Sequence, residues 1–332
     1  MTRSNQATSK LMKAIVCTTY GPPDVLQLKE VEKPTPKEDE ALVKVHAASV
    51  NAADLETLRG DFIVRMAAPR KPMYRILGTD IAGRVEAVGR NVKQFQPGDE
   101  IWGDLSACGW GAFAEYVCVP DNELRLKPAS MTFEEAAAYP QAAVLALQNL
   151  RDKRPIQPGQ KVLINGAGGG VGTFAVQIAK YFGAEVTGVD STTKLDMLRS
   201  IGADHVIDYT KEDFTKSGQC YDLIVDVVAR RSIFAYRRAL NPDGICVFVG
   251  GSTAAVFQAL LLGPLISRTG SQKMGIVMWK PNNKEALAFL EELFEAGKVV
   301  PVIDRRYPLS EVPEALRYLD EEPHLGKIVI TM

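Results

Sequence analysis

The sequence has little of three things: cysteine, net charge and long apolar runs. Its five cysteines are scattered and none belongs to a C-x-x-C pair, which argues against a disulfide framework. Its 39 Lys and Arg nearly balance 40 Asp and Glu, so the formal charge is −1 and the electrostatic footprint of a general nucleic-acid binder is missing. The longest apolar stretch, residues 256–266, is interrupted by Gly263 and Pro264 and falls well short of the roughly 20 residues of a membrane span.

The sequence does contain enough apolar residues for a large core. Hydrophobic residues make up 46% of the 332 positions and charged residues 24%, as in ordinary globular proteins. At about 150 residues per domain, this length predicts two domains. The first ten residues are polar and lack the apolar region of a signal peptide, so we expect a disordered tail, with an organellar presequence as the alternative. Together these features predict a soluble, cytoplasmic protein without membrane association.

The two halves of the chain follow different patterns. Before residue 130, short β-favouring runs alternate with turn clusters such as Gly21-Pro22-Pro23, which predicts a barrel-like β domain. From Lys161 onward, apolar strands alternate with amphipathic helices, which predicts a doubly wound parallel sheet.

The last 50 or so residues differ again, and Asn283 can cap a helix that runs to Ala296. We expect this tail to return to the β domain. The predicted β domain is therefore discontinuous (1–140 and 280–332), and the predicted α/β domain covers 141–279.

The strongest motif is the run Asn165-Gly-Ala-Gly-Gly-Gly-Val-Gly172, which lies between a predicted strand and a predicted helix. Glycines there permit a tight turn, close approach of backbone N–H groups to a diphosphate and close packing of helix on strand. The helix then directs its positive end at the phosphates. We therefore predict a dinucleotide site rather than a merely flexible turn. The predicted contacts in this loop are Ala167, Gly169, Gly170, Val171 and Gly172.

The residues after the next predicted strand bear on which dinucleotide binds. Asp190 can accept hydrogen bonds from both ribose hydroxyls and would repel a 2′-phosphate, which favours NAD(H). Lys194 could instead neutralise a 2′-phosphate, with a hydrogen bond from Ser191. An equally good alternative is that the threonines at 192 and 193 cap a helix and that Lys194 is solvated. The choice between NAD(H) and NADP(H) stays open, with a slight preference for NAD(H).

Seven motifs follow one another along nearly the whole chain. They are Val50-Asn51-Ala-Ala-Asp54, Leu77-Gly-Thr-Asp80-Ile-Ala-Gly83, Pro97-Gly98-Asp99, the glycine run that ends at Gly172, Gly202-Ala-Asp-His-Val-Ile-Asp-Tyr209, Tyr221-Asp-Leu-Ile-Val-Asp226 and His324-Leu-Gly-Lys327. With them the chain resembles the medium-chain dehydrogenase/reductase superfamily, and within it the zinc-independent quinone oxidoreductase (zeta-crystallin-like) branch. This resemblance implies a GroES-like β-barrel catalytic domain, a Rossmann domain, a cofactor in the cleft between them, and a homodimer that acts on a small-molecule substrate.

The resemblance also implies chemistry without zinc. Zinc alcohol dehydrogenases of this superfamily place a Cys and a His where this chain has Asn51 and Thr79, and neither residue is a good zinc ligand. Without a Lewis acid, a quinone or an α,β-unsaturated carbonyl is easier to reduce than a simple aldehyde, because conjugation delocalises the developing charge. Asn51 is the candidate catalytic residue that positions the substrate, with Asp54 nearby. The alternative is that both side chains only shape their loop.

Other positions follow the family pattern or depart from it. Lys194 and Tyr209 have the spacing of the pair that grips the 2′-phosphate in NADPH-type relatives. Glu56 and Leu145 stand where relatives often have Tyr and Thr, which keeps a second hypothesis open: a catalytically weak dinucleotide-binding sensor or structural protein. A third hypothesis is that the protein is a zinc-type alcohol dehydrogenase.

Two segments near the expected cofactor complete the prediction. Val249, Gly250 and Gly251 resemble the stretch that passes the nicotinamide ring, where a side chain would crowd the ring. Lys327 resembles a family lysine near the mouth of the cleft, and we interpret it as a solvated charge at the end of a strand.

Overall fold

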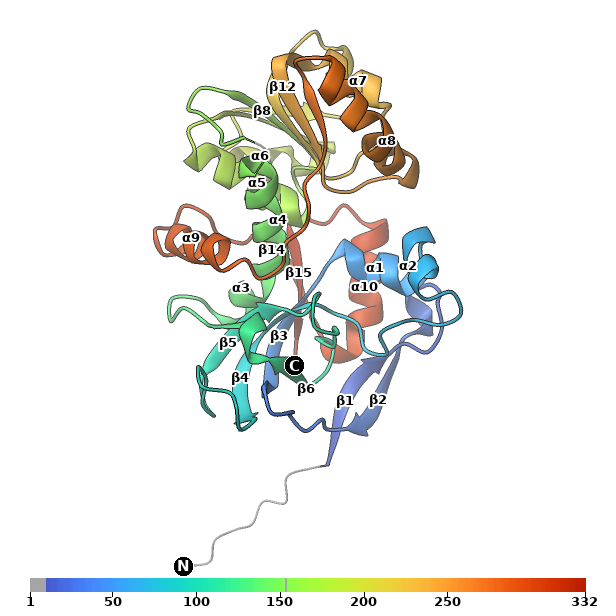
Figure 1. The fold of residues 1–332 in the computed structure, drawn as a ribbon, viewed down its shortest axis with the longest axis vertical. Helices are drawn as coiled ribbons and strands as arrows, with labels where there is room; N and C mark the ends of the chain where they lie inside the picture. The colour runs from blue at the N-terminus through green and yellow to red at the C-terminus, as the bar shows by residue number, and fades with distance from the viewer. Residues whose placement is uncertain (1–9, 153) are drawn as a thin grey trace, which may run out of the picture. The chain divides into compact units, whose positions relative to one another are not determined.

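The computed structural model describes residues 10–152 and 154–332, so the predicted N-terminal tail, apart from Lys10, lies outside the described residues. The chain forms two compact units, whose elements are labelled in Figure 1. Unit 1 runs up to Pro140 and resumes at Arg305–Glu322 and Ile328–Met332, and unit 2 comprises Gln141–Asp304 and Pro323–Lys327. Across the described ranges, no helix has both the length and the apolar character needed to cross a bilayer.

Unit 1 is built on a seven-stranded sheet in which β14, β15, β3, β4, β5 and β7 are neighbours in that order and β6 pairs with β3. These strands are β3 (Glu40–Val50), β4 (Asp80–Val88), β5 (Glu100–Asp104), β6 (Tyr116–Pro120), β7 (Leu124–Leu126), β14 (Ile303–Pro308) and β15 (Lys327–Thr331). A separate antiparallel pair is formed by β1 (Leu11–Val16) and β2 (Gln27–Glu32). The helices are α1 (Ala52–Arg59), α2 (Phe62–Ala67), α3 (Phe133–Ala138) and α10 (Val312–Glu321). Residues from β1, β3, β4, α10 and β15 share one apolar core.

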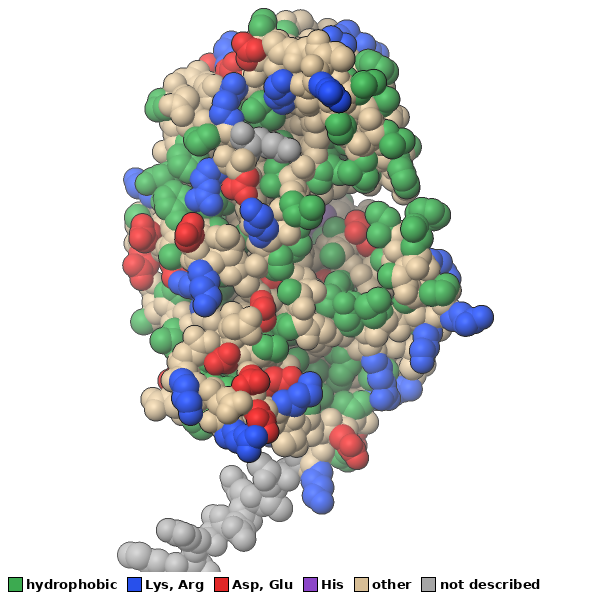
Figure 2. All heavy atoms as spheres, viewed as in Figure 1, with side chains coloured by type: hydrophobic (Ala, Val, Ile, Leu, Met, Phe, Trp, Pro, Cys, Tyr) green, Lys and Arg blue, Asp and Glu red, His purple; other side chains and the backbone are tan. Residues whose placement is uncertain are grey.

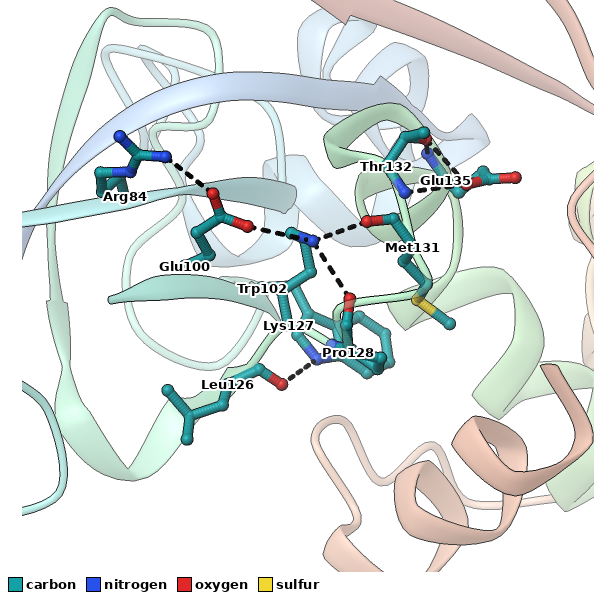
Figure 3. A network of polar contacts seen from close by, with 9 residues as sticks. All are labelled: Arg84, Glu100, Trp102, Leu126, Lys127, Pro128, Met131, Thr132 and Glu135. Carbon is teal, nitrogen blue, oxygen red and sulfur yellow. Dashed lines mark hydrogen bonds and ion pairs between the residues drawn. The ribbon is translucent and has the colours of Figure 1, made fainter. Parts of the chain in front are cut away.

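A buried lysine joins β5 to the segment that leads into α3 (Figure 3). The Lys127 ammonium donates to the carbonyl oxygens of Pro128 (3.1 Å) and Met131 (2.6 Å), and it lies 3.1 Å from a carboxylate oxygen of Glu100. Its side chain is 4% exposed. Arg84 donates to the other oxygen of Glu100, and these two cations lower the pKa of the Glu100 carboxyl. The lysine therefore fixes the turn that precedes α3, where Thr132 and Glu135 form a capping box.

Replacing Lys127 with Met is expected to lower the free energy of unfolding by about 2–4 kcal/mol, because two carbonyl groups and a carboxylate lose a buried donor. Chemical denaturation would measure the loss. The matched control is Arg84→Met, which removes the exposed partner of the same carboxylate and should cost less than about 1 kcal/mol. Equal losses in both variants would contradict this account.

Unit 2 is a parallel six-stranded sheet with the strand order β10-β9-β8-β11-β12-β13. Its strands are β8 (Lys161–Asn165), β9 (Glu185–Asp190), β10 (His205–Asp208), β11 (Tyr221–Asp226), β12 (Leu240–Phe248) and β13 (Lys273–Ile276). Its helices are α4 (Pro140–Arg151), α5 (Gly170–Tyr181), α6 (Leu195–Ser200), α7 (Ile233–Arg238), α8 (Thr253–Thr269) and α9 (Lys284–Glu295). The order reverses direction at β8, which confirms the predicted doubly wound α/β sheet and places a topological switch point beside the glycine run.

The second predicted domain boundary, at residue 280, is wrong. The first boundary coincides with the division after Pro140, but the return to unit 1 occurs at Arg305. Side-chain contacts explain the difference, because α9 stays with unit 2: Phe289 stacks on Phe182 at 6.0 Å between ring centroids. The Gln177 amide also donates to the carbonyl of Val300 and accepts from its N–H. Amphipathic pattern alone could not tell which unit would cover this helix.

Candidate cofactor site

The glycine run forms the turn from β8 into α5, and its backbone is tightly constrained. Gly166 has a φ of +79°, and its N–H donates to the carbonyl of Val189 on the neighbouring strand. A Cβ on Gly172 would lie 2.1 Å from the Gly166 oxygen and 2.6 Å from the Ala167 carbonyl carbon. Helix α5 therefore begins directly against the turn, as close approach of a diphosphate to backbone N–H groups requires.

The predicted loop contacts divide into two groups. Gly169, Gly170 and Val171 keep part of their surface exposed at the start of α5, where a ligand can reach them. Ala167 and Gly172 are buried, and the Ala167 N–H donates to the Val189 carbonyl. The first group has the geometry of a phosphate cradle, and the second holds the cradle in shape. Contact of this loop with a dinucleotide stays a prediction.

An ion pair lies against the same loop. One carboxylate oxygen of Asp190 accepts from the Gly168 N–H at 2.7 Å and the other accepts from the Ser191 N–H at 2.8 Å. The Lys194 ammonium lies 3.4 Å from the second oxygen, and both side chains are less than a tenth exposed. The alternative of a solvated Lys194 is therefore wrong, because its stem packs on Gly168 and its charge on Asp190.

The other residues predicted near the adenosine end gather at the carboxyl ends of β9 and β10. The Ser191 hydroxyl lies 3.3 Å from that of Thr193, so the two share a hydrogen bond. Tyr209 donates its N–H to the carbonyl of Asp190, and 53% of the Tyr209 residue is exposed. The structure therefore brings Asp190, Ser191, Lys194 and Tyr209 to one edge of the sheet.

Asp208, which sequence reasoning missed, anchors this edge. It accepts hydrogen bonds from the hydroxyls of Thr192 and Thr210, which lower the pKa of its carboxyl, and Lys211 lies 3.0 Å from it. The available signal was its place at the end of a strand, in register with Asp190.

The segment Val249–Gly251 follows β12, and its backbone conformation at position 251 requires glycine. Gly251 has a φ of +132°, and a Cβ on it would lie 2.2 Å from the Ala229 oxygen. The Val249 N–H donates to the Asp226 carbonyl at 2.8 Å. Contact of this segment with a nicotinamide ring stays a prediction.

The candidate catalytic residues Asn51 and Asp54 lie at the start of α1 in unit 1, and both are buried. The Asn51 amide nitrogen donates to Thr79 Oγ1 at 3.2 Å and to Asp80 Oδ2 at 3.0 Å. The Asp54 carboxylate accepts from the N–H groups of Asn51 (2.8 Å) and Gly78 (3.0 Å). These contacts tie α1 to the loop before β4, so both residues shape the loop, and their catalytic role stays a prediction.

Asp54→Ala is expected to lower the free energy of unfolding by about 3 kcal/mol, since two buried N–H groups lose a charged acceptor. Asp54→Asn, which keeps one acceptor oxygen and nearly the same volume, should lose less. Urea denaturation of both variants would measure the difference. A loss below about 1 kcal/mol for Asp54→Ala would show that water or neighbouring groups replace the carboxylate.

Metal ligands are sparse in the part of the chain that the structure describes. Over residues 10–152 and 154–332, no group of three or more His, Cys, Asp or Glu is arranged to hold a metal ion. Burial raises the pKa of the thiols of Cys108 and Cys118 to about 12, so neither is a ready thiolate.

Lys327 is buried beside the glycine run, contrary to its interpretation as a solvated strand-end charge. It is only 2% exposed, its N–H donates to the Val302 carbonyl, and its stem lies over Gly170. The available signal was the motif that ends at Lys327, which resembles that of a family lysine near the mouth of the cleft.

Known proteins provide an independent comparison. A family model described as "Alcohol dehydrogenase GroES-like domain" matches residues 37–129, and one described as "Zinc-binding dehydrogenase" matches residues 201–330. The chain is 36% identical to a 2-methylene-furan-3-one reductase of Solanum lycopersicum, over 96% of this chain and 79% of that protein. It is 33% identical to an NADPH-dependent alkenal/one oxidoreductase, chloroplastic, of Arabidopsis thaliana, over 97% of this chain and 80% of that protein. The solved quinone oxidoreductase of Coxiella burnetii is 30% identical, with a TM-score of 0.87 over 97% of this chain and 100% of that one.

Proposed function

Because this chain belongs to the zinc-independent quinone oxidoreductase branch of the medium-chain dehydrogenase/reductase superfamily, we propose that it is an NAD(P)H-dependent reductase of quinones or α,β-unsaturated carbonyls. The observation that carries this proposal is the glycine cradle at the start of α5, with the Asp190 carboxylate bound to the Gly168 N–H. When bound there, the nicotinamide cofactor supplies the hydride. The residues of the chain bind and orient it.

Both NADH and NADPH fit the edge formed by β9 and β10. The preference for NAD(H) rests on repulsion between Asp190 and a 2′-phosphate, and the Lys194 ammonium at 3.4 Å cancels much of that repulsion. Lys194, with Ser191 and Tyr209 close by, also offers a cation and hydroxyl donors to a 2′-phosphate. The proposal is therefore that NADPH is used at least as well as NADH.

The reaction is proposed to proceed without zinc. At the two positions where zinc relatives have their first ligands, Asn51 and Thr79 bond to each other through amide nitrogen and hydroxyl, which are poor ligands for zinc. A conjugated acceptor suits such a site because neutral hydrogen-bond donors can stabilise its delocalised charge.

Turnover assays test this function. NADH and NADPH oxidation would be followed with 9,10-phenanthrenequinone, with an enone and with an aldehyde, each with and without a chelator. We expect turnover with the quinone or the enone that the chelator leaves unchanged. Aldehyde reduction that the chelator abolishes would contradict the zinc-free mechanism. Cofactor binding without turnover on any acceptor would favour the alternative of a dinucleotide-binding sensor.

The remaining proposals concern surroundings and assembly. The protein is proposed to act in the cytoplasm on a small-molecule substrate, without nucleic-acid or membrane partners, and as a homodimer.

The surface that supports a dimer lies at the edge of the unit 2 sheet, where β13 is the last strand. Beside it α8 exposes large apolar side chains, and Figure 2 shows hydrophobic side chains over this part of the surface. They include Phe257, Leu260, Leu261 and Leu265.

The double variant Leu261→Glu/Leu265→Glu is expected to convert the dimer to a monomer, since both leucines are more than half exposed and two carboxylates would meet across the interface. Sedimentation velocity would show the change in mass. The control is Leu28→Glu/Leu126→Glu, which alters two exposed leucines of unit 1 and should leave the dimer intact. A monomeric parent protein would overturn the homodimer proposal.

A further inference from the structure

Two aromatic rings of unit 1 stack on each other outside its strands. Tyr74 lies in the segment between α2 and β4, and Trp110 lies in the loop between β5 and β6. The centroids of the two rings are 5.0 Å apart, and their planes are inclined by 10°. Both side chains pack on the apolar core of unit 1 and keep part of their surface exposed. This pair is called the aromatic stack below.

The backbone of Trp110 is strained. Its φ is +64°, in the left-handed region, which a bulky residue rarely adopts. Glycine or asparagine would adopt this conformation at a lower cost. A loop that needed only this backbone shape would not favour tryptophan, so the position requires the indole ring itself. Strain of this kind is concentrated at binding and catalytic sites.

The aromatic stack is attached to the loop that holds the candidate catalytic residues. The N–H of Gly111, which follows Trp110 in the chain, donates to the Gly78 carbonyl at 3.1 Å. The residue after Gly78 is Thr79, whose hydroxyl accepts from the Asn51 amide at 3.2 Å. The other ring of the stack belongs to the segment that leads to Gly78. Both rings are therefore close along the backbone to the Asn51–Thr79 pair.

Close packing makes this attachment rigid. Gly78 has a φ of +90°, and a Cβ on it would lie 2.8 Å from Ala112 Cβ and 2.8 Å from a ring carbon of Phe113. On the other side of the segment, the Arg75 carbonyl accepts from the Cys17 N–H at 2.7 Å. Because the segment is held from two sides, the aromatic stack keeps a defined position relative to the candidate catalytic residues.

We propose that the aromatic stack determines substrate specificity: the rings of a planar aromatic acceptor, such as a fused-ring quinone, stack on it while the acceptor carbonyl lies beside Asn51 and Thr79. Flat ring systems stack favourably on aromatic side chains, whereas an open-chain enone has no ring to stack. This inference rests on the proposed function and narrows it, because it predicts a preference for fused-ring quinones over open-chain enones.

The test compares two acceptors with the purified full-length protein and NADPH: 9,10-phenanthrenequinone, which has fused rings, and methyl vinyl ketone, which has none. The kcat/KM for each would be measured in the parent protein and in Tyr74→Phe, Tyr74→Leu, Trp110→Leu and Trp110→Asn. Tyr181→Leu is the matched control, because Tyr181 is also a partly exposed ring that packs on an aromatic neighbour, but in unit 2. Melting temperatures would be measured in parallel.

Trp110→Leu and Tyr74→Leu are expected to lower kcat/KM for the quinone by about tenfold, mainly through KM, and that for methyl vinyl ketone by less than about twofold. Tyr74→Phe keeps the ring and should match the parent, as should Tyr181→Leu. Trp110→Asn should lose the same preference for the quinone but melt above Trp110→Leu, since asparagine tolerates the left-handed conformation. A purely structural tryptophan would instead affect both acceptors equally.

The inference is overturned if the ratio of the two kcat/KM values stays at the parent level in Trp110→Leu and Tyr74→Leu, or if Trp110→Asn recovers the parent ratio. A parent protein that reduces methyl vinyl ketone but not the quinone would also overturn it. In each case the proposed function stands as long as the parent turns over at least one acceptor. A parent that reduces neither would contradict the proposed function itself, so the two failures are distinguishable in one set of rates.

Discussion

Replacing Gly172 with Ala is expected to weaken dinucleotide binding by at least about one-hundredfold. The added Cβ would lie 2.1 Å from the Gly166 oxygen and 2.6 Å from the Ala167 carbonyl carbon, and both are backbone atoms. No rotamer change can relieve that overlap, so α5 and the glycine run must move apart. A displacement of about 1 Å in a positioned binding loop is enough for an effect of this size. Titration with ADP-ribose and NADPH would measure it.

Two other glycines provide controls. A Cβ on Gly169 has no neighbour closer than 3.6 Å, and a Cβ on Gly275 of β13 has none within 4 Å. Gly275→Ala should bind cofactor as the parent does. Gly169→Ala should keep the fold, and any loss of affinity in it reports directly on a ligand at the exposed side of the loop. Full binding by Gly172→Ala would contradict the close packing of helix on turn.

The sequence predicts those parts of this site that depend on local geometry. A run such as Gly166–Gly172 can be read without a structure, because the turn, the helix start and the strand before it are adjacent in the chain. The β9 end is equally local, since Asp190 and Lys194 are four residues apart. Their burial as a pair could not be read, because it depends on the packing of the Lys194 stem over Gly168.

What the sequence could not predict depends on contacts between distant segments. Lys327 has the pattern of a strand-end charge, and the bond between Gly326 and Gly168 shows that its segment lies against the glycine run. The same limit applies to α9, whose apolar face predicts a helix but not the aromatic rings of Phe182 and Phe289 that keep it with unit 2. The apolar stretch around Pro264 is a further case: it excluded a membrane span but gave no sign of the 17-residue helix α8.

Lys194→Met is expected to reduce kcat/KM for NADPH by about one-hundredfold and to change kcat/KM for NADH by less than about threefold. Loss of the ammonium removes a charged partner of the 2′-phosphate. It also leaves Asp190 without its neutralising ion pair, which restores repulsion of the 2′-phosphate but not of a ribose hydroxyl. Steady-state kinetics with both cofactors at a fixed quinone concentration would measure the two effects.

Lys211→Met is the matched control, because Lys211 pairs with an aspartate at the same sheet edge, 3.0 Å from Asp208, but is 69% exposed. It should leave both cofactors unaffected. If Lys194→Met impaired NADH and NADPH equally, Lys194 would act through the loop that Asp190 holds, and selectivity would lie elsewhere.

Substitutions of Asp190 separate its two effects, the repulsion of a 2′-phosphate and the support of the glycine run through hydrogen bonds. Asp190→Ala removes the repulsion of a 2′-phosphate and should favour NADPH, but it also removes the acceptor of the Gly168 and Ser191 N–H groups. Asp190→Asn removes the charge and keeps one acceptor oxygen. The ratio of NADPH to NADH use should therefore rise in both variants, whereas the affinity for ADP-ribose should fall further in Asp190→Ala. A ratio that falls in Asp190→Asn would show that the carboxylate helps NADPH binding by holding Lys194 in place, and that the ion pair acts as one unit.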